Sequence, residues 1–318
     1  MATNDRVITV PQPDGFEWRE TPAGPALVCR ALEPFASHLF TTRRWPLGST
    51  PDGDRASAWA DIARALGVDV AHLERAHQVH GASVVVRRAG DPPRGDAPLP
   101  DADIIVSDDP AIVLSIQTAD CVPLLIADRR TGASAAAHAG WRGLAASVPR
   151  VTVDALGRQF GSRPGDLIAA VGPSIGACCY EVGVDVLDAF RLGGFDEATR
   201  HRWFFTGPQP SAENPSMPGL RRAERADRWF FDAWLATRYQ LEAAGMAADQ
   251  IHVAGLCTAS HPETLCSYRR DGRRAGRIAG AIRCASRRKS ANTSLPSRGP
   301  RETTQRCRWV RHRAPRLP

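Results

Sequence analysis

The sequence predicts an α/β (α+β) sandwich, a single domain of mixed sheets with flanking helices. Short apolar runs typical of strands are mixed along the chain with segments in which apolar residues recur at helical spacing. Two of the runs are joined by a turn-forming segment, which predicts an antiparallel hairpin. The hairpin favours mixed sheets over a regular doubly wound sheet of parallel strands.

The first third of the chain predicts three strands, one helix and a loop. Strands are expected over residues 7–10 and 26–30. Residues 59–66 have the apolar spacing of a helix. The valine run at residues 84–86 is expected to be a buried strand, whereas Pro, Gly and Asp mark residues 91–100 as a loop.

The centre of the chain is the most regular part. It holds three apolar runs that are expected to be strands, at residues 111–115, 122–127 and 133–137. Residues 128–132 provide the hairpin turn between the last two. Cys121 precedes the second run and His138 follows the third. Because paired strands of a hairpin run in opposite directions, both side chains are expected at the end away from the turn.

The second half predicts further strands and helices. A helix is expected over residues 144–160, since Gly140 and Gly143 permit a tight turn into it. Strands are expected at residues 167–171 and 251–256. Helices are expected at residues 184–192 and 228–244.

The composition is that of an ordinary soluble globular protein. Of its residues, 43% are hydrophobic and 24% are charged. A length of 318 residues is enough for a substantial core. Residues 284–318 hold ten Lys and Arg against one Glu, a net of +9, so the rest of the chain carries −2 of the total +7. The body gives no reason to expect nucleic acid as a partner. We expect a lead-in over residues 1–34, the main domain over 35–283 and a disordered basic tail over 284–318.

The cysteines and the N-terminus predict a cytoplasmic protein. Eight cysteines are scattered without the spacing of a disulfide framework. The first residues lack the charged-then-apolar pattern of a secretory signal, and no apolar run approaches the roughly 18 residues of a membrane span. We therefore expect no membrane association.

Two histidines and one cysteine are the candidate metal ligands: His80, Cys121 and His138. Imidazole and thiolate are ligands that zinc accepts, and three protein ligands leave a fourth position for water or substrate. The separations of 41 and 17 residues match no zinc finger. Each residue on its own is better explained without a metal: His80 by a contact with a backbone carbonyl, Cys121 by burial and His138 by a polar cap at a strand end. Convergence of the three in space would make a metal site.

Several short motifs stand in one order between residues 35 and 283. They are Gln78-Val79-His80-Gly81, Asp101-Ala102-Asp103, Thr118-Ala119-Asp120-Cys121-Val122-Pro123, His138-Ala139-Gly140-Trp141-Arg142-Gly143, Val171-Gly172-Pro173-Ser174-Ile175-Gly176 with Cys178-Cys179-Tyr180-Glu181-Val182-Gly183, and Ser267-Tyr268-Arg269-Arg270 with Gly276-Arg277. Together they resemble the YfiH-type family, also called the laccase-domain or polyphenol oxidase family.

The resemblance implies a zinc-dependent enzyme that acts on purine nucleosides. The implied reactions are phosphorolysis of the glycosidic bond and deamination of adenosine, which makes purine nucleosides and phosphate the partners. It also implies that His80, Cys121 and His138 are catalytic residues and the zinc ligands. The main domain is then the catalytic domain.

Four further residues are candidate substrate contacts. Arg43 and Arg142 are expected to hold phosphate, because a guanidinium offers paired donors to its oxygens. Gln78 is expected to reach the purine edge or to cap a turn. Asp120 is expected to orient a ligand or to move a proton.

The chain departs from the family pattern in two places. Thr42-Arg43 leads into Arg44-Trp45-Pro46-Leu47-Gly48-Ser49 rather than a Gly-Gly-Val-Ser turn, and Thr237 takes a helix position that is often Asn in relatives.

The adjacent Arg269 and Arg270 could also bind an anion. They are expected on a strand, where neighbouring side chains point to opposite faces, so at most one of them faces the site.

Three alternatives stay open. Cys121 as nucleophile and His138 as base would make a metal-free cysteine hydrolase. The resemblance implies cell-wall precursor editing as a role for such an enzyme. Copper-dependent phenol oxidation is less favoured, because laccases use paired His-X-His motifs and none of the nine histidines forms such a pair. A non-enzymatic binding protein would result if the altered loop after Arg43 closed the site.

Cys178 and Cys179 are expected to pack beside Gly176.

Overall fold

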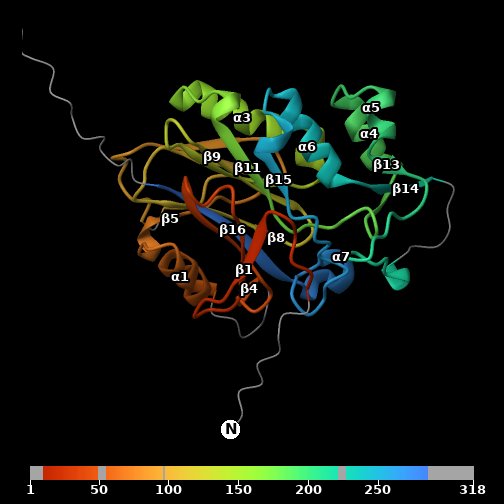
Figure 1. The fold of residues 1–318 in the computed structure, drawn as a ribbon, viewed down its shortest axis with the longest axis horizontal. Helices are drawn as coiled ribbons and strands as arrows, with labels where there is room; N and C mark the ends of the chain where they lie inside the picture. The colour runs from red at the N-terminus through yellow and green to blue at the C-terminus, as the bar shows by residue number, and fades with distance from the viewer. Residues whose placement is uncertain (1–9, 49–54, 96, 221–226, 286–318) are drawn as a thin grey trace, which may run out of the picture. The chain divides into compact units, whose positions relative to one another are not determined.

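Two β-sheets pack face to face, and helices cover the outer face of each (Figure 1). The computed structural model describes residues 10–48, 55–95, 97–220 and 227–285. All of these residues belong to one compact unit. The predicted α/β sandwich of mixed sheets and flanking helices is confirmed.

The first sheet has seven strands in the order β1-β2-β3-β16-β8-β5, with β4 also paired to β16. Their bounds are β1 (Phe16–Arg19), β2 (Ala26–Cys29), β3 (Ala36–Thr41), β4 (Leu47–Gly48), β5 (Leu73–Glu74), β8 (Val113–Thr118) and β16 (Gly276–Cys284). Only the β5–β8 pairing is parallel among the pairings of this sheet that the described residues make. Helix α1 (Arg55–Ala65) covers the outer face, where Trp59 and Ile62 pack with Leu39 and Val113.

The second sheet has six strands in the order β15-β11-β9-β10-β7-β6. Their bounds are β6 (Val84–Arg87), β7 (Ile104–Ser107), β9 (Val122–Asp128), β10 (Ser134–Ala139), β11 (Leu167–Val171) and β15 (Ile251–Val253). Along β9, Leu124 and Ile126 face the covering helices, whereas Leu125 and Ala127 face the first sheet, as the period of two in a strand requires. Helices α3 (Val148–Phe160), α4 (Val184–Leu192) and α6 (Ala233–Ala243) cover the outer face.

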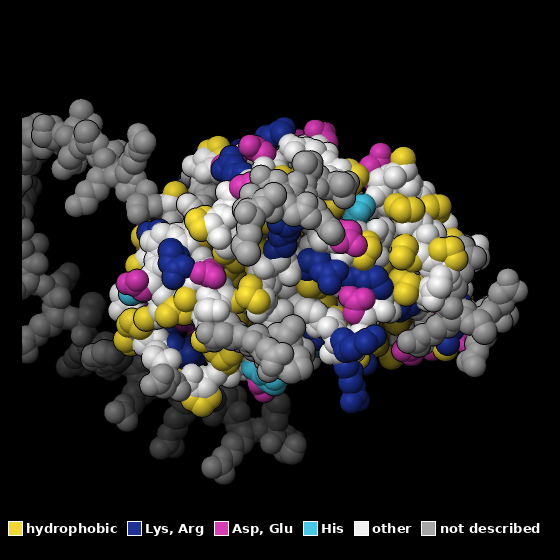
Figure 2. Space-filling view, turned by 90° about the horizontal axis from the view of Figure 1, so that it is seen from below, with side chains coloured by type: hydrophobic (Ala, Val, Ile, Leu, Met, Phe, Trp, Pro, Cys, Tyr) yellow, Lys and Arg dark blue, Asp and Glu magenta, His cyan; other side chains and the backbone are white. Residues whose placement is uncertain are grey.

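Shorter elements complete the unit. A small sheet has the order β12-β14-β13, with bounds β12 (Glu181–Gly183), β13 (Phe204–Phe205) and β14 (Arg228–Phe231). The short helices are α2 (Trp141–Ala145), α5 (Glu197–His201) and α7 (Tyr268–Asp271), with 3-10 turns η1 (Val70–His72), η2 (Pro164–Asp166), η3 (Pro218–Leu220), η4 (Ala248–Gln250) and η5 (Gly272–Arg274). Within the described ranges, no helix is long and apolar enough to cross a membrane. On the face shown in Figure 2, basic and acidic side chains are interspersed.

Most predicted elements are confirmed. The central hairpin forms from β9 and β10, and α4 has the predicted bounds of residues 184–192. The loop at residues 91–100 contains no helix or strand among its described residues. The predicted strand at residues 7–10 lies outside the described residues except for Val10, and the tail lies outside them from residue 286 onward.

Two predicted helices are wrong at their N-terminal ends. The one over residues 144–160 is divided into α2 and α3 at Ser147, whose φ of 60° is left-handed. The one over residues 228–244 begins as strand β14, because the aromatic run there has high strand propensity. Helix α6 starts only after Asp232, whose side chain accepts a hydrogen bond from the main-chain N–H of Leu235 at 2.9 Å.

Three smaller predictions are also corrected. The valines of β6 are half-buried rather than buried, because β6 is an edge strand of its sheet. The strand expected over residues 251–256 ends at Val253. Arg269 and Arg270 lie in helix α7 rather than in a strand.

Candidate metal centre

The β9–β10 hairpin brings Cys121 and His138 together, as predicted. His138 in β10 pairs with Pro123 in β9, and Cys121 lies two residues before Pro123. Both side chains are therefore at the end of the hairpin opposite its turn. Asp120, directly before Cys121, has a φ of 91°, a strained conformation of the kind that is concentrated at functional sites.

His80 reaches the hairpin from the loop between β5 and β6. Its φ of 62° is also left-handed. The ligand atoms of His80, Cys121 and His138 all lie within 4.8 Å of one another, and the two imidazole rings meet edge to face. His80 is exposed, Cys121 half-buried and His138 buried. The structure thus brings the three predicted ligands together with one side accessible.

Asp103 orients both histidines. Its Oδ1 accepts a hydrogen bond from His138 Nδ1 at 2.7 Å, which leaves His138 Nε2 as the nitrogen that can bind a metal. Its carboxylate also accepts the main-chain N–H groups of Val79, His80 and Gly81 at 3.3, 3.0 and 2.6 Å. Asp103 is fully buried, so these hydrogen bonds hold the His80 turn in its left-handed conformation.

The residues present fit a metal ion. Two imidazoles and one thiolate are a donor set that transition metals accept. A Cβ placed on Gly140 would lie 2.8 Å from Cys121 Sγ and 3.1 Å from His80 Cδ2. Only glycine at this position leaves room for the two ligands to approach each other.

The charges of the three ligands interact. Burial raises the pKa of the Cys121 thiol, but His138 and His80 outweigh burial and lower that pKa to about 6. Burial lowers the pKa of His138, but Cys121 and Asp103 outweigh it and raise that pKa to about 9. Near neutral pH the favoured state is a thiolate beside an imidazolium, and the thiolate is the form of cysteine that binds metals.

Asp120 ties the loop before Cys121 to the C-terminal part of the chain. Its carboxylate accepts the hydroxyl of Thr258 and the main-chain N–H of Arg269, both at 2.6 Å. Its carbonyl accepts the N–H of Ile175 at 2.9 Å. Burial raises the pKa of Asp120, although these hydrogen bonds oppose the shift. These contacts position Cys121 through the main chain.

His80, Cys121 and His138 open onto a cavity of about 820 Å³. Three aromatic side chains line it, from Trp141, Tyr180 and Tyr268. Three guanidinium groups also line it, from Arg142, Arg269 and Arg277. The Arg142 guanidinium stacks on the Trp141 ring at 4.1 Å, and that of Arg269 lies over Tyr180 at 5.5 Å. The cavity therefore offers aromatic faces and positive charge beside the ligands.

The predicted substrate contacts differ in their placement. Gln78, Asp120 and Arg142 line the cavity. The Gln78 amide forms two hydrogen bonds of 2.8 Å with the main chain of Gln117, so it extends the edge of β8.

Arg43 is not among the described residues that line the cavity, and its guanidinium donates to the carbonyl of Pro262. Of the adjacent arginines, Arg269 faces the cavity, whereas Arg270 donates to the carbonyls of Thr258 and Ala259.

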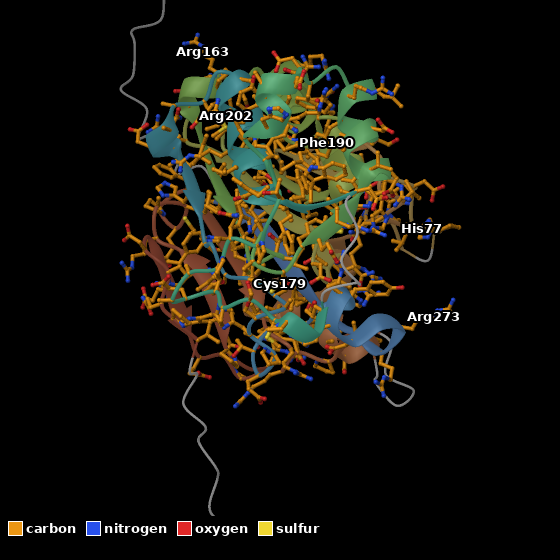
Figure 3. The ribbon with its side chains drawn as sticks, turned by 90° about the vertical axis from the view of Figure 1, so that its right-hand side faces the viewer. His77, Arg163, Cys179, Phe190, Arg202 and Arg273 are labelled. Atoms are coloured by element: carbon orange, nitrogen blue, oxygen red, sulfur yellow. The ribbon has the colours of Figure 1, made fainter. Side chains whose placement is uncertain are left out.

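Asp103, Tyr180 and Arg277 are not among the predicted site residues, although each lies in one of the family motifs. The signal for Asp103 was its place in Asp101-Ala102-Asp103, one strand away from the hairpin. His77 is also not among the predicted site residues. It lines the cavity, and its Nδ1 lies 2.7 Å from Asp101 Oδ1. Figure 3 shows His77 at the edge of the molecule.

Comparison with solved structures gives the same fold. The crystal structure of Bacillus licheniformis hypothetical protein YfiH matches with a TM-score of 0.71 and 26% identity, over 84% of this chain and 98% of that one. The crystal structure of YlmD from Geobacillus stearothermophilus matches with a TM-score of 0.68 and 27% identity, over 86% of this chain and all of that one.

Curated relatives are similar over much of the chain. "Purine nucleoside phosphorylase" of Deinococcus radiodurans is 35% identical over 77% of this chain and 88% of its own length. "Adenosine deaminase RL5", from an unknown prokaryotic organism, is 32% identical over 70% of this chain and 78% of its own length. A Bacteroides thetaiotaomicron "Purine nucleoside phosphorylase" is 36% identical over 57% of this chain, which spans 60% of that relative.

A family model described as "Multi-copper polyphenol oxidoreductase laccase" matches residues 53–285. This match covers the elements from α1 to β16 and includes His80, Cys121 and His138. It agrees with the relatives and with the solved YfiH and YlmD structures. The chain belongs to the multi-copper polyphenol oxidoreductase laccase family, which confirms its resemblance to YfiH-type proteins.

Proposed function

We propose that this protein is a zinc-dependent purine nucleoside phosphorylase that also deaminates adenosine. The observation that carries the proposal is the meeting of His80, Cys121 and His138 on the wall of a cavity lined by aromatic and cationic side chains. Relatives named purine nucleoside phosphorylase and adenosine deaminase support it. Its substrates are then purine nucleosides and phosphate.

Zinc suits the three ligands better than copper. Laccase-type copper centres use paired His-X-His motifs, and none of the nine histidines of the sequence forms such a pair. Zinc accepts three protein ligands and keeps an accessible fourth position, which agrees with the exposed side of His80. When bound, zinc would supply Lewis-acid activation of water and of polar substrate groups.

The guanidinium groups hold phosphate in this proposal. Arg142, Arg269 and Arg277 line the cavity and offer donors in the geometry that phosphate oxygens accept. Phosphate held there attacks the anomeric carbon of the ribose, and the purine leaves with the electron pair of the glycosidic bond. Arg43 is a weaker candidate, because its guanidinium contacts Pro262 outside the cavity lining.

The remaining cavity residues bind the purine and exchange protons. Trp141, Tyr180 and Tyr268 present rings on which a purine can stack. His77, held at Nδ1 by Asp101, has its second ring nitrogen available for proton exchange at the cavity wall. In deamination, water adds to the purine carbon that bears the amino group, and ammonia leaves.

The proposal also includes a catalytic domain over residues 35–283 and a cytoplasmic location. The domain bounds rest on the extent of the motifs, and the location rests on the scattered cysteines. Fractionation of the native host with detection of the full-length chain tests the location.

A chromatographic time course with adenosine tests the activity. Zinc-loaded protein is expected to give adenine only with phosphate, and inosine with or without it. Cys121→Ala, checked for its fold by circular dichroism, is expected to lose zinc and both products. Adenosine that stays unchanged with zinc-loaded wild-type protein would contradict the nucleoside activity.

A metal-free cysteine hydrolase is the second candidate. The lowered pKa of Cys121 beside His138 is the state of an activated thiol nucleophile. Such an enzyme keeps its activity after zinc is removed by a chelator and forms a covalent adduct on Cys121. A chelated protein that is inactive and regains activity with zinc excludes it.

A further inference from the structure

A second group of metal-binding side chains lies outside the site described above. The sulfurs of Cys178, Cys179 and Cys257 lie within 4.8 Å of one another. The three residues are 3%, 4% and 0% exposed. Figure 3 labels Cys179 near the centre of the view. The expectation that Cys178 and Cys179 only pack beside Gly176 leaves the approach of Cys257 unexplained.

Main-chain hydrogen bonds position the three sulfurs. Ser174 pairs with the segment around Cys257, through Ser174 N to the Leu256 carbonyl at 3.2 Å and Thr258 N to the Ser174 carbonyl at 3.1 Å. The turn that follows Ser174 carries Cys178 and Cys179 back over this pairing, with Cys179 N donating to the Gly176 carbonyl at 2.9 Å.

Asn214 fastens a covering segment to the same place. Its side-chain amide donates to the Gly255 carbonyl and its oxygen accepts the N–H of Cys257, both at 2.7 Å. The chain after Asn214 then brings Met217 and Leu220 against the three cysteines. The thiols are held between two segments that are each anchored by hydrogen bonds.

The side chains packed around the three thiols are mostly apolar. Ile175 and Ala259 complete the buried cluster. Ser260 Oγ lies 3.6 Å from Cys178 Sγ and 3.5 Å from Cys179 Sγ, and its own proton goes to the Pro215 carbonyl at 2.8 Å. Within the described part of the chain, no histidine or carboxylate joins the three thiols in this group.

We propose that Cys178, Cys179 and Cys257 bind a soft monovalent ion of the Cu(I) type. Thiolate and thioether ligands favour Cu(I), whereas structural zinc sites are almost always closed by four protein ligands. On binding, the coordinating thiols release their protons to solvent, and the ion keeps its oxidation state. The segment that follows Cys257 is held by the Arg270 guanidinium, which donates to the carbonyls of Thr258 and Ala259.

This thiol site is separate from the proposed zinc site but is linked to it through neighbouring residues. Cys257 precedes Thr258, which binds Asp120 next to Cys121, and Cys179 precedes Tyr180 on the cavity wall. The two sites must therefore be separated by mutation. The proposal does not depend on the nucleoside activity.

Anaerobic Cu(I) titration of the full chain against a chromophoric Cu(I) chelator tests the site. The background variant is Cys121→Ala with Cys307→Ser, which removes the zinc-site thiol and the tail thiol. It is expected to bind one Cu(I), with an all-sulfur first shell by X-ray absorption. Adding Cys257→Ser is expected to abolish this binding, whereas adding Cys266→Ser, the matched control for a buried cysteine elsewhere, leaves it unchanged.

Three results would overturn the proposal. They are a background variant that binds no Cu(I), Cys257→Ser binding as well as the background, and Zn(II) binding more tightly than Cu(I) at these thiols. If Cys257→Ser does not fold by circular dichroism, Cys178→Ser takes its place. The X-ray absorption result on the folded background variant decides in any case.

Discussion

The Asp103 carboxylate lies 2.7 Å from His138 Nδ1, and the same oxygen lies 3.0 Å from the main-chain nitrogen of His80. One buried acid thus orients one ligand through its ring and the other through its backbone. His138 is left with Nε2 for the metal, and the turn that carries His80 keeps its positive φ.

Asp103→Asn is expected to weaken zinc binding about 10- to 100-fold, the usual effect of losing a carboxylate that orients a metal-bound histidine. The amide keeps the size of the side chain but loses its charge and one acceptor oxygen. Competition with a chromophoric chelator measures the affinity. Asp101→Asn is the matched control, because its partner His77 is exposed and outside the ligand group; equal affinities for the two variants would remove the assigned role of Asp103.

Gly140→Ala is expected to abolish zinc binding while the fold is retained. Its Cβ would meet Cys121 Sγ at 2.8 Å and push the thiol away from His80. Metal content by atomic absorption and the unfolding midpoint by circular dichroism measure the two effects. Gly165→Ala, where a Cβ meets nothing within 4 Å, is expected to keep zinc. A zinc-loaded Gly140→Ala protein would show that the site does not need this close approach.

The pH dependence of Cys121 alkylation is expected to have a midpoint at about 6 in chelator-treated protein, because the thiolate is the reactive form. For an ordinary cysteine the midpoint of alkylation is expected at a pH of about 8.5. The pKa in the folded state is depressed, so the thiolate stabilises the fold above the ordinary pKa, and this contribution is lost as pH falls through about 6. Added zinc is expected to block labelling.

Mass spectrometry of iodoacetamide-labelled peptides follows this reaction residue by residue. Cys266 provides an internal control, because burial raises its pKa to about 11 and keeps it slow to react. A Cys121 midpoint near the ordinary value would contradict the thiolate–imidazolium pair.

Arg269→Met is expected to raise the KM for phosphate about tenfold, which corresponds to about 1.4 kcal/mol. The loss of a charge-assisted contact to phosphate accounts for a change of this size. Deamination of adenosine uses no phosphate, so its rate is expected to stay near that of the wild type. Arg43→Met is the matched control; a raised phosphate KM in this variant alone would restore the sequence-based assignment to Arg43.

Local patterns in the sequence were enough to predict the β9–β10 hairpin and the meeting of Cys121 with His138. Both follow from two apolar runs and the turn between them, which are contacts close in sequence. The bounds of α4 could be predicted for the same reason. The family motifs added His80, which periodicity alone would have left as an ordinary loop residue.

Tertiary structure decided the rest, because these contacts join residues far apart in the chain. Asp103 reaches His138 because β7 pairs with β10. Arg269 is placed by its own main-chain N–H, which donates to the carboxylate of Asp120, 149 residues earlier in the chain. Strand β16 lies at the centre of its sheet, yet it is rich in Gly and Ala and has a weak strand propensity, so neighbouring strands specify it. The three-thiol group likewise exists only because Ser174 and Asn214 join separate segments around Cys257.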